Sequence, residues 1–113
     1  MYFGKEIRIV LKGQAEEAYL KLKERNDKEA KSILNSFNRI KEILKKNPQY
    51  GYPIKKELIP QELKKLDIQN LYRVELSNYW RMLYTIEGDT ITIFLFVLKI
   101  MNHKDYNKLF GYK

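Results

Sequence analysis

The chain has 113 residues and no cysteine, which allows one domain with a modest core and excludes disulfides and thiolate metal sites. Its 22 Lys and Arg residues against 14 Asp and Glu leave a formal charge of +8. Such a surface attracts polyanions, which can be nucleic acid, an acidic protein or an anionic membrane, although it also simply favours solubility. No segment has the apolar length of a signal peptide or a membrane span. We therefore expect residues 1–113 to form one cytoplasmic domain that does not contact a membrane.

The first half of the chain has the pattern of a strand followed by two helices. Residues 6–12 alternate apolar and polar side chains, which is typical of a strand. Residues 14–25 place apolar side chains at helical spacing. A second helix, capped by Asn26 or Asp27, should run to about Lys46 and be joined to the first as an antiparallel hairpin. Its apolar stripe predicts core packing rather than a cofactor site and consists of Ala30, Ile33, Leu34, Phe37, Ile40 and Leu44.

The middle of the chain is a proline-rich loop. Residues 48–60 hold all three prolines and predict a structured loop with a short extended piece at 54–58. It carries Lys55, Lys56 and Glu57, which could fold back beside the segment that follows. The simpler interpretation is that these three side chains are solvated. Residues 61–66 then have the pattern of a helical turn.

The segment from Leu71 to Tyr84 predicts two short strands, each with one apolar and one polar face. Residues that lie opposite each other in an antiparallel pair point to the same side of the sheet. Both apolar rows share a side only if an odd number of residues forms the turn, which makes residues 77–79 the natural choice. Glu75 then lies opposite Arg81, with Arg73 one step along the same polar face.

The last part of the chain predicts one more strand and a polar tail. Residues 87–89 have turn composition, and residues 90–99 are apolar on both sides, as in a strand that has a layer on each face. The element order predicts an α+β domain: an N-terminal strand, a two-helix antiparallel hairpin, and a mostly antiparallel sheet of about four strands. The helical hairpin should cover the apolar face of this sheet and leave the face with Arg73 and Arg81 open.

The residues that could carry chemistry are cations and proton carriers. The chain has no glycine-rich phosphate loop, no GxSxG motif and a single histidine, so nothing predicts a metal site or a bound cofactor. Arg73 and Arg81 could hold a phosphate, with Lys55 and Lys56 adding to the positive field. His103 or Tyr106 could donate a proton, and Glu57 or Glu75 could accept one. Cleavage of RNA without a metal needs such groups, but each residue taken alone is equally consistent with an ordinary surface position.

The hairpin and the tail together resemble the RelE/ParE toxin superfamily. The typical pattern of that family, a "yRi…yRvlY" hairpin, a strand and an "H(R/K)xxY" tail, is similar to residues 72–74, 79–84 and 103–106. The runs NLYRVELSNYWRMLY and DYNKLFGYK look most like an archaeal RelE-like branch. The similarity spans essentially the whole chain and implies a RelE-like fold.

The resemblance implies the toxin of a type II toxin–antitoxin pair, which a helical and acidic antitoxin neutralises. RelE-like members cleave mRNA in the ribosomal A site without metal and so inhibit translation. By this resemblance Arg81 binds the scissile phosphate, Arg73 is a supporting cation, and His103 or Tyr106 is the acid. Glu57 lies near the loop position where the YoeB branch keeps a glutamate base. The expected RNA-binding residues are Lys55, Lys56 and Lys104.

One residue departs from the RelE pattern. Glu75 stands where RelE keeps a second lysine, and it would either weaken Arg81 or supply the base. Two other functions therefore stay open for the same fold. The chain could be a ParE-like inhibitor of a topoisomerase or a catalytically inactive partner, or an RNA- or ribosome-binding protein without toxicity.

Overall fold

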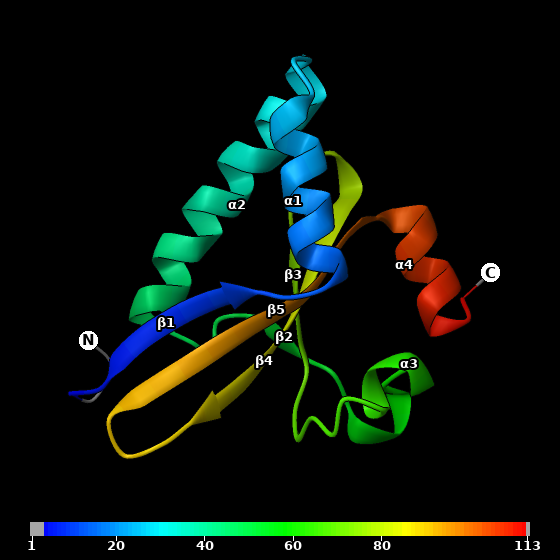
Figure 1. The fold of residues 1–113 in the computed structure, drawn as a ribbon. Helices are drawn as coiled ribbons and strands as arrows, with labels where there is room; N and C mark the ends of the chain where they lie inside the picture. The colour runs from blue at the N-terminus through cyan, green and yellow to red at the C-terminus, as the bar shows by residue number, and fades with distance from the viewer. Residues whose placement is uncertain (1–3, 113) are drawn as a thin grey trace.

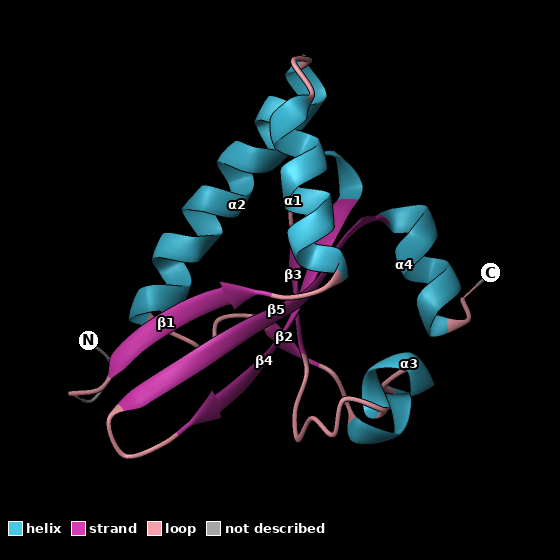
Figure 2. Ribbon diagram, in the orientation of Figure 1, coloured by secondary structure: helices cyan, strands magenta, loops and turns pink. Residues whose placement is uncertain are grey.

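The computed structural model describes residues 4–112 and shows an α+β fold, as the element order predicted (Figure 1). Helices α1 and α2 rise from one side of a sheet, while the short helices α3 and α4 lie away from them (Figure 2). The elements in chain order are β1 (Glu6–Leu11), α1 (Gln14–Glu24), α2 (Lys28–Lys46), β2 (Tyr52–Pro53), α3 (Gln61–Lys64), β3 (Tyr72–Glu75), β4 (Trp80–Gly88), β5 (Thr92–Asn102) and α4 (His103–Phe110). Two 3₁₀ turns cover Lys56–Leu58 and Ser77–Tyr79.

The described strands form one mixed sheet in the order β1-β5-β4-β3-β2. The pairs β2–β3, β3–β4 and β4–β5 are antiparallel, and β1 lies parallel to β5. The sheet therefore has five strands rather than about four. The additional strand is β2, whose two residues pair with Tyr72 and Arg73 from within the proline-rich loop. The extended residues of this loop are Tyr52 and Pro53 rather than the predicted 54–58, because Lys56–Leu58 form a 3₁₀ turn.

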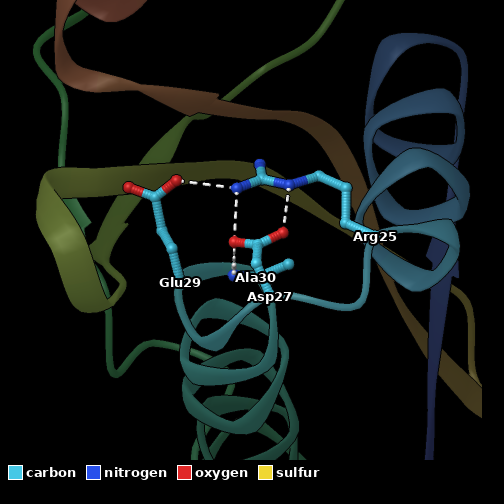
Figure 3. A network of polar contacts seen from close by, with 4 residues as sticks. All are labelled: Arg25, Asp27, Glu29 and Ala30. Atoms are coloured by element: carbon cyan, nitrogen blue, oxygen red, sulfur yellow. Dashed lines mark hydrogen bonds and ion pairs between the residues drawn. The ribbon is translucent and has the colours of Figure 1, made fainter.

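The turn between α1 and α2 is held by a network of charges (Figure 3). Asp27, not Asn26, caps α2, because its carboxylate accepts the backbone N–H of Ala30 at 3.1 Å. Arg25 donates to both oxygens of Asp27 at 2.9 and 2.8 Å and to Glu29 at 2.8 Å. These hydrogen bonds, with Arg25 contributing most, lower the pKa of Asp27 to about 2. The network stabilises the short connection between α1 and α2, at which the chain reverses direction.

The apolar stripe of α2 packs on one face of the sheet, as predicted. Ala30, Ile33 and Leu44 are fully buried there, together with Ala15 from α1. Strands β3, β4 and β5 contribute side chains from the same face, namely Val74, Met82, Tyr84, Leu95, Val97 and Ile100. Because these residues come from all the long elements, this cluster is the main core and fixes the helices on the sheet.

The opposite face of the sheet carries a second, smaller core. Leu83, Leu98 and Met101 from the sheet meet Leu63 of α3 and Tyr106 of α4. This cluster explains why the last strand is apolar on both sides. It also corrects one expectation, because the face with Arg73 and Arg81 is not fully open but is partly covered by α4. Residues 103–110 of the polar tail, for which the sequence predicted no secondary structure, form helix α4.

The central hairpin has the register that its alternation predicts. Tyr72 lies opposite Tyr84, Val74 opposite Met82, and Glu75 opposite Arg81. The turn is the three-residue segment 77–79, closed by the N–H of Leu76 on the carbonyl of Trp80 at 2.8 Å. The Ser77 N–H donates to the hydroxyl of Ser36 at 3.0 Å, which ties the turn to α2.

Strand β5 extends beyond the predicted 90–99 and contains an irregularity. Leu83 pairs with Lys99 but Tyr84 pairs with Val97, so Leu98 is an extra residue in the ladder. After this bulge, odd- and even-numbered side chains exchange the faces of the sheet to which they point. Ile100 therefore packs in the main core together with Val97, while Leu98 packs in the second core. The bulge therefore lets one strand supply both layers.

No helix within residues 4–112 is long and apolar enough to cross a membrane.

Candidate functional site

Two arginines from neighbouring strands meet at one tyrosine. Arg73 of β3 donates from Nη1 to the hydroxyl of Tyr106 at 3.3 Å. The guanidinium carbon of Arg81, on β4, lies 5.1 Å from the centre of the same ring, within cation–π distance. Arg73 and Arg81 point to the same face of the sheet, because the three-residue turn pairs Arg81 with Glu75, which lies on the same face of β3 as Arg73. We call these three residues the Arg73–Tyr106–Arg81 cluster.

Helix α4 brings Tyr106 to the arginines. Asn102 caps the helix by accepting the backbone N–H of Asp105 at 2.9 Å. Tyr106 is only 2% exposed and stacks on Phe110 with ring centres 4.5 Å apart. The helix ends at Gly111, whose φ of 76° suits the left-handed position, and Tyr112 then donates to the carbonyl of Asn107 at 2.8 Å. The reversal leaves Tyr112 close to Tyr106 and Phe110, with ring centres 6.4 and 5.8 Å away.

Neither arginine uses all of its N–H groups in hydrogen bonds to residues 4–112. The hydrogen bond with Tyr106 raises the pKa of Arg73, against the smaller opposite effect of burial, so its guanidinium stays charged. Arg81 donates from Nη1 to the carbonyl of Tyr79 at 3.2 Å. Its buried Nε has no acceptor among residues 4–112. A buried donor without a partner costs about 1–3 kcal/mol.

Glu75 is the carboxylate beside Arg81. One of its oxygens lies 3.9 Å from Nη2 of Arg81, at the limit for an ion pair. The Glu75 side chain is 67% exposed and the Arg81 side chain 21%. Exposed pairs of this kind contribute about 0–1 kcal/mol. Glu75 therefore does not immobilise Arg81, and its carboxylate remains accessible from solvent.

The turn of the hairpin places a tyrosine next to Arg81. Tyr79 is 76% exposed and has a φ of 62°, a left-handed conformation that bulky residues rarely adopt. Its ring meets the ring of His103 edge-on at 5.8 Å. Tyr79 thus connects His103, the first residue of α4, with Arg81. Strain of this kind at an exposed aromatic residue is more common at functional positions than elsewhere.

A cavity of about 610 Å³ opens on the Arg73 side of Tyr106. Its walls are formed by residues 52–55, Leu58, Arg73, Tyr106 and Tyr112. The guanidinium carbon of Arg73 also lies 4.9 Å from the centre of the Tyr52 ring. Tyr52 and Tyr112 are 64% and 51% exposed, so the cavity has aromatic walls that face water. Pairing of β2 with β3 brings these loop residues to the arginine.

The structure brings together some of the predicted site residues but not all of them. Arg73, Arg81, Tyr106 and Glu75 form one connected group, and Lys55 reaches it through the cavity. His103 reaches it only through Tyr79. The other three predicted residues are exposed, and no hydrogen bond or ion pair within residues 4–112 joins them to the cluster; they are Lys56, Glu57 and Lys104.

Three residues of the site were not predicted from the sequence, namely Tyr52, Tyr79 and Tyr112. A chain with nine tyrosines does not reveal which of them pack in the core and which remain exposed. The available signal was local composition, since each of the three lies in a turn or next to a glycine rather than in an apolar stripe. Only the pairing of β2 and the reversal at Gly111 place two of them around Arg73.

The cluster offers anion binding together with proton-transfer groups. Guanidinium groups with free N–H donors suit phosphate oxygens, and exposed aromatic rings suit nucleobases. A phenol, an imidazole and a carboxylate lie in or beside the group. Within residues 4–112, no three His, Asp or Glu side chains lie close enough together to hold a metal ion.

No protein-family model, no curated protein and no solved structure matches this chain.

Proposed function

We propose that the chain is a RelE-like toxin that cleaves mRNA on the ribosome and so inhibits translation. The observation that carries this proposal is the convergence of Arg73 and Arg81 on Tyr106. Charged N–H groups without protein acceptors next to a phenol form a suitable site for a phosphodiester. The +8 charge of the chain favours the approach of a polyanion.

In this proposal the two arginines hold the scissile phosphate. Charge grows on the phosphate oxygens as the 2′-oxygen attacks, and fixed guanidinium groups stabilise that charge without reorganising. Arg81 is half-buried and rests on the ring of Tyr106, so its position is set by the fold rather than by the substrate. Loss of one such donor typically lowers a rate by about 10²–10³-fold.

The same proposal assigns the proton transfers. Glu75 is the base that takes the 2′-hydroxyl proton, because it is the one predicted carboxylate that lies next to an arginine of the cluster. Glu57 shows no comparable contact, and we do not assign it the role. Tyr106 is the acid that protonates the departing 5′-oxygen, since its hydroxyl accepts a hydrogen bond from Arg73 and the residue lines the cavity. His103, at the exposed start of α4, supports binding through Tyr79.

The partners follow from the same proposal. The ribosome presents the mRNA. An acidic helical antitoxin binds over the basic site and keeps the toxin inactive. Residues 1–113 alone should therefore arrest growth, and co-expression of that antitoxin should restore it.

The test is induction of the wild-type chain and of Arg81→Ala in growing cells and in a translating extract. We expect growth arrest and new 5′ ends inside coding regions with the wild type, and neither with Arg81→Ala. Lys45→Ala, which changes an exposed cation on α2 far along the chain from the cluster, is the matched control and should behave as the wild type. Intact mRNA together with impaired DNA supercoiling would instead identify a ParE-like inhibitor, and growth without arrest would identify an inactive or non-toxic protein.

A further inference from the structure

We infer that the cavity beside Arg73 binds one unpaired nucleotide of the RNA, with its base stacked on Tyr52 or Tyr112 and its phosphate on Arg73 and Lys55, with little preference for base identity. This inference rests on the proposed function for its choice of RNA as the ligand. It adds the residues beside the Arg73–Tyr106–Arg81 cluster that hold an unpaired nucleotide, namely Tyr52, Tyr112 and Lys55.

The size and lining of the cavity fit a nucleotide. Its volume of about 610 Å³ lies within the range of ~300–1,000 Å³ that holds small organic ligands. Two of its wall residues are aromatic rings that are more than half exposed, Tyr52 and Tyr112. Stacking a base on such a ring contributes about 1–3 kcal/mol and needs a base that is not paired or covered by neighbours.

Two cations, Arg73 and Lys55, line the same cavity as the Tyr52 ring. Arg73 contacts the ring of Tyr52 at 4.9 Å and is oriented by the hydroxyl of Tyr106 at 3.3 Å. Lys55 is exposed at the rim of the same cavity. One wall therefore combines an aromatic face with two positive charges, which is the combination that binds single-stranded nucleic acid.

The lining also predicts weak discrimination between bases. Base edges are distinguished by amides such as Asn and Gln, by carboxylates that accept hydrogen bonds, and by Arg or Lys donating to guanine. None of the described residues that line this cavity is Asn, Gln, Asp or Glu, and its two cations, Arg73 and Lys55, are assigned to the phosphate. The Tyr52 and Tyr112 rings stack with any base, and Arg73 and Lys55 recognise the phosphate. A duplex, whose bases are already stacked, should enter poorly.

The experiment measures RNA binding by the purified chain without ribosomes. The probes are fluorescent 2′-O-methyl hexanucleotides of A, C, G or U, which lack the attacking 2′-hydroxyl, and a duplex of matched charge. We expect at least one of Tyr52→Ala and Tyr112→Ala to weaken single-strand binding about 5- to 150-fold, which corresponds to the loss of one stack. Tyr52→Phe, which keeps the ring, should bind within about threefold of the wild type.

Tyr50→Ala is the matched control, because Tyr50 is 50% exposed and lies two residues from Tyr52 but is not part of the cavity wall. It should bind as the wild type, and circular dichroism should show all variants folded. Unchanged binding in both Tyr52→Ala and Tyr112→Ala would overturn the inference, as would equal affinity for the duplex or a preference of more than about tenfold for one base.

The design separates this inference from the proposed function. Ring-dependent binding of single strands without any mRNA cleavage would leave the inference standing and refute the toxin mechanism. Cleavage that persists unchanged in Tyr52→Ala and Tyr112→Ala would leave the function standing and refute the inference.

Discussion

Replacement of Tyr84 with phenylalanine removes one oxygen atom from the centre of the protein. Tyr84 is 0% exposed, and its hydroxyl donates to the carbonyl of Pro48 at 2.7 Å and accepts the N–H of Gly51 at 3.0 Å. These two bonds attach the proline-rich loop to the sheet immediately before β2. There is no room for a substitute at Gly51, since an added Cβ would lie 2.8 Å from that hydroxyl.

The magnitude follows from the two groups that lose their partner. A buried donor or acceptor left unsatisfied costs about 1–3 kcal/mol. Two such groups predict that Tyr84→Phe lowers the free energy of unfolding by about 2–6 kcal/mol, a large share of the ~5–15 kcal/mol typical of a domain. Because Tyr52 follows Gly51 directly, we also expect weaker binding of single-stranded RNA.

Urea denaturation followed by circular dichroism measures this loss. The control is Tyr72→Phe, because Tyr72 stacks on Tyr84 at 5.3 Å while its hydroxyl has no hydrogen-bond partner within residues 4–112. Tyr72→Phe should stay within about 0.5 kcal/mol of the wild type. A loss for Tyr84→Phe that is no larger than for Tyr72→Phe would refute the reasoning.

The remaining predictions concern the α1–α2 turn and the site. The pKa of Asp27, lowered to about 2 from an unfolded value near 3.9, adds stability that is present above pH ~4 and lost as the pH falls through 2. The urea midpoint of Asp27→Asn should accordingly fall less steeply between pH 4 and 2 than that of the wild type, and equal slopes would contradict this. Glu75→Gln should change the stability by less than about 1 kcal/mol but lower the rate of mRNA cleavage about 10²-fold or more at pH 7, since it removes the proposed base. Unchanged or faster cleavage would show that Glu75 is not the base and is only an ion-pair partner of Arg81. Tyr79→Gly should raise the free energy of unfolding by up to about 1 kcal/mol, because glycine adopts the left-handed turn without strain, and thermal denaturation that shows a loss would disprove the strain.

Long periodic segments allowed much of the fold to be predicted from the sequence. The stripe of α2 and the alternation of β3 and β4 both reflect burial on one side, which is a local and repeated signal. The parity of the turn then determined which residues face each other, and Glu75 does lie opposite Arg81. The placement of Arg73, Glu75 and Arg81 on one face could therefore be predicted from the alternation of apolar and polar residues alone.

Other parts of the site depend on contacts that no local pattern records. Strand β2 has only two residues, and its pairing with β3 is a long-range event. Helix α4 has eight mostly polar residues, too few for a clear apolar stripe, and only the capping Asn102 signals its start. The burial of Tyr106 follows from the second core, which requires the bulge at Leu98 and the position of α3. The cavity and its exposed tyrosines could not be predicted without these tertiary contacts.

The most direct test of the central claim is single-turnover cleavage of a defined mRNA on purified ribosomes that are paused with an empty A site. We expect cleavage within the A-site codon by the wild-type protein and a 2′,3′-cyclic phosphate on the upstream fragment. The rate should be lowered about 10²–10³-fold in Arg81→Ala and in Arg73→Ala, with Lys45→Ala unaffected. Intact mRNA after incubation with the folded wild-type protein, or equal cleavage by Arg81→Ala, would contradict the claim that the Arg73–Tyr106–Arg81 cluster is a ribonuclease site.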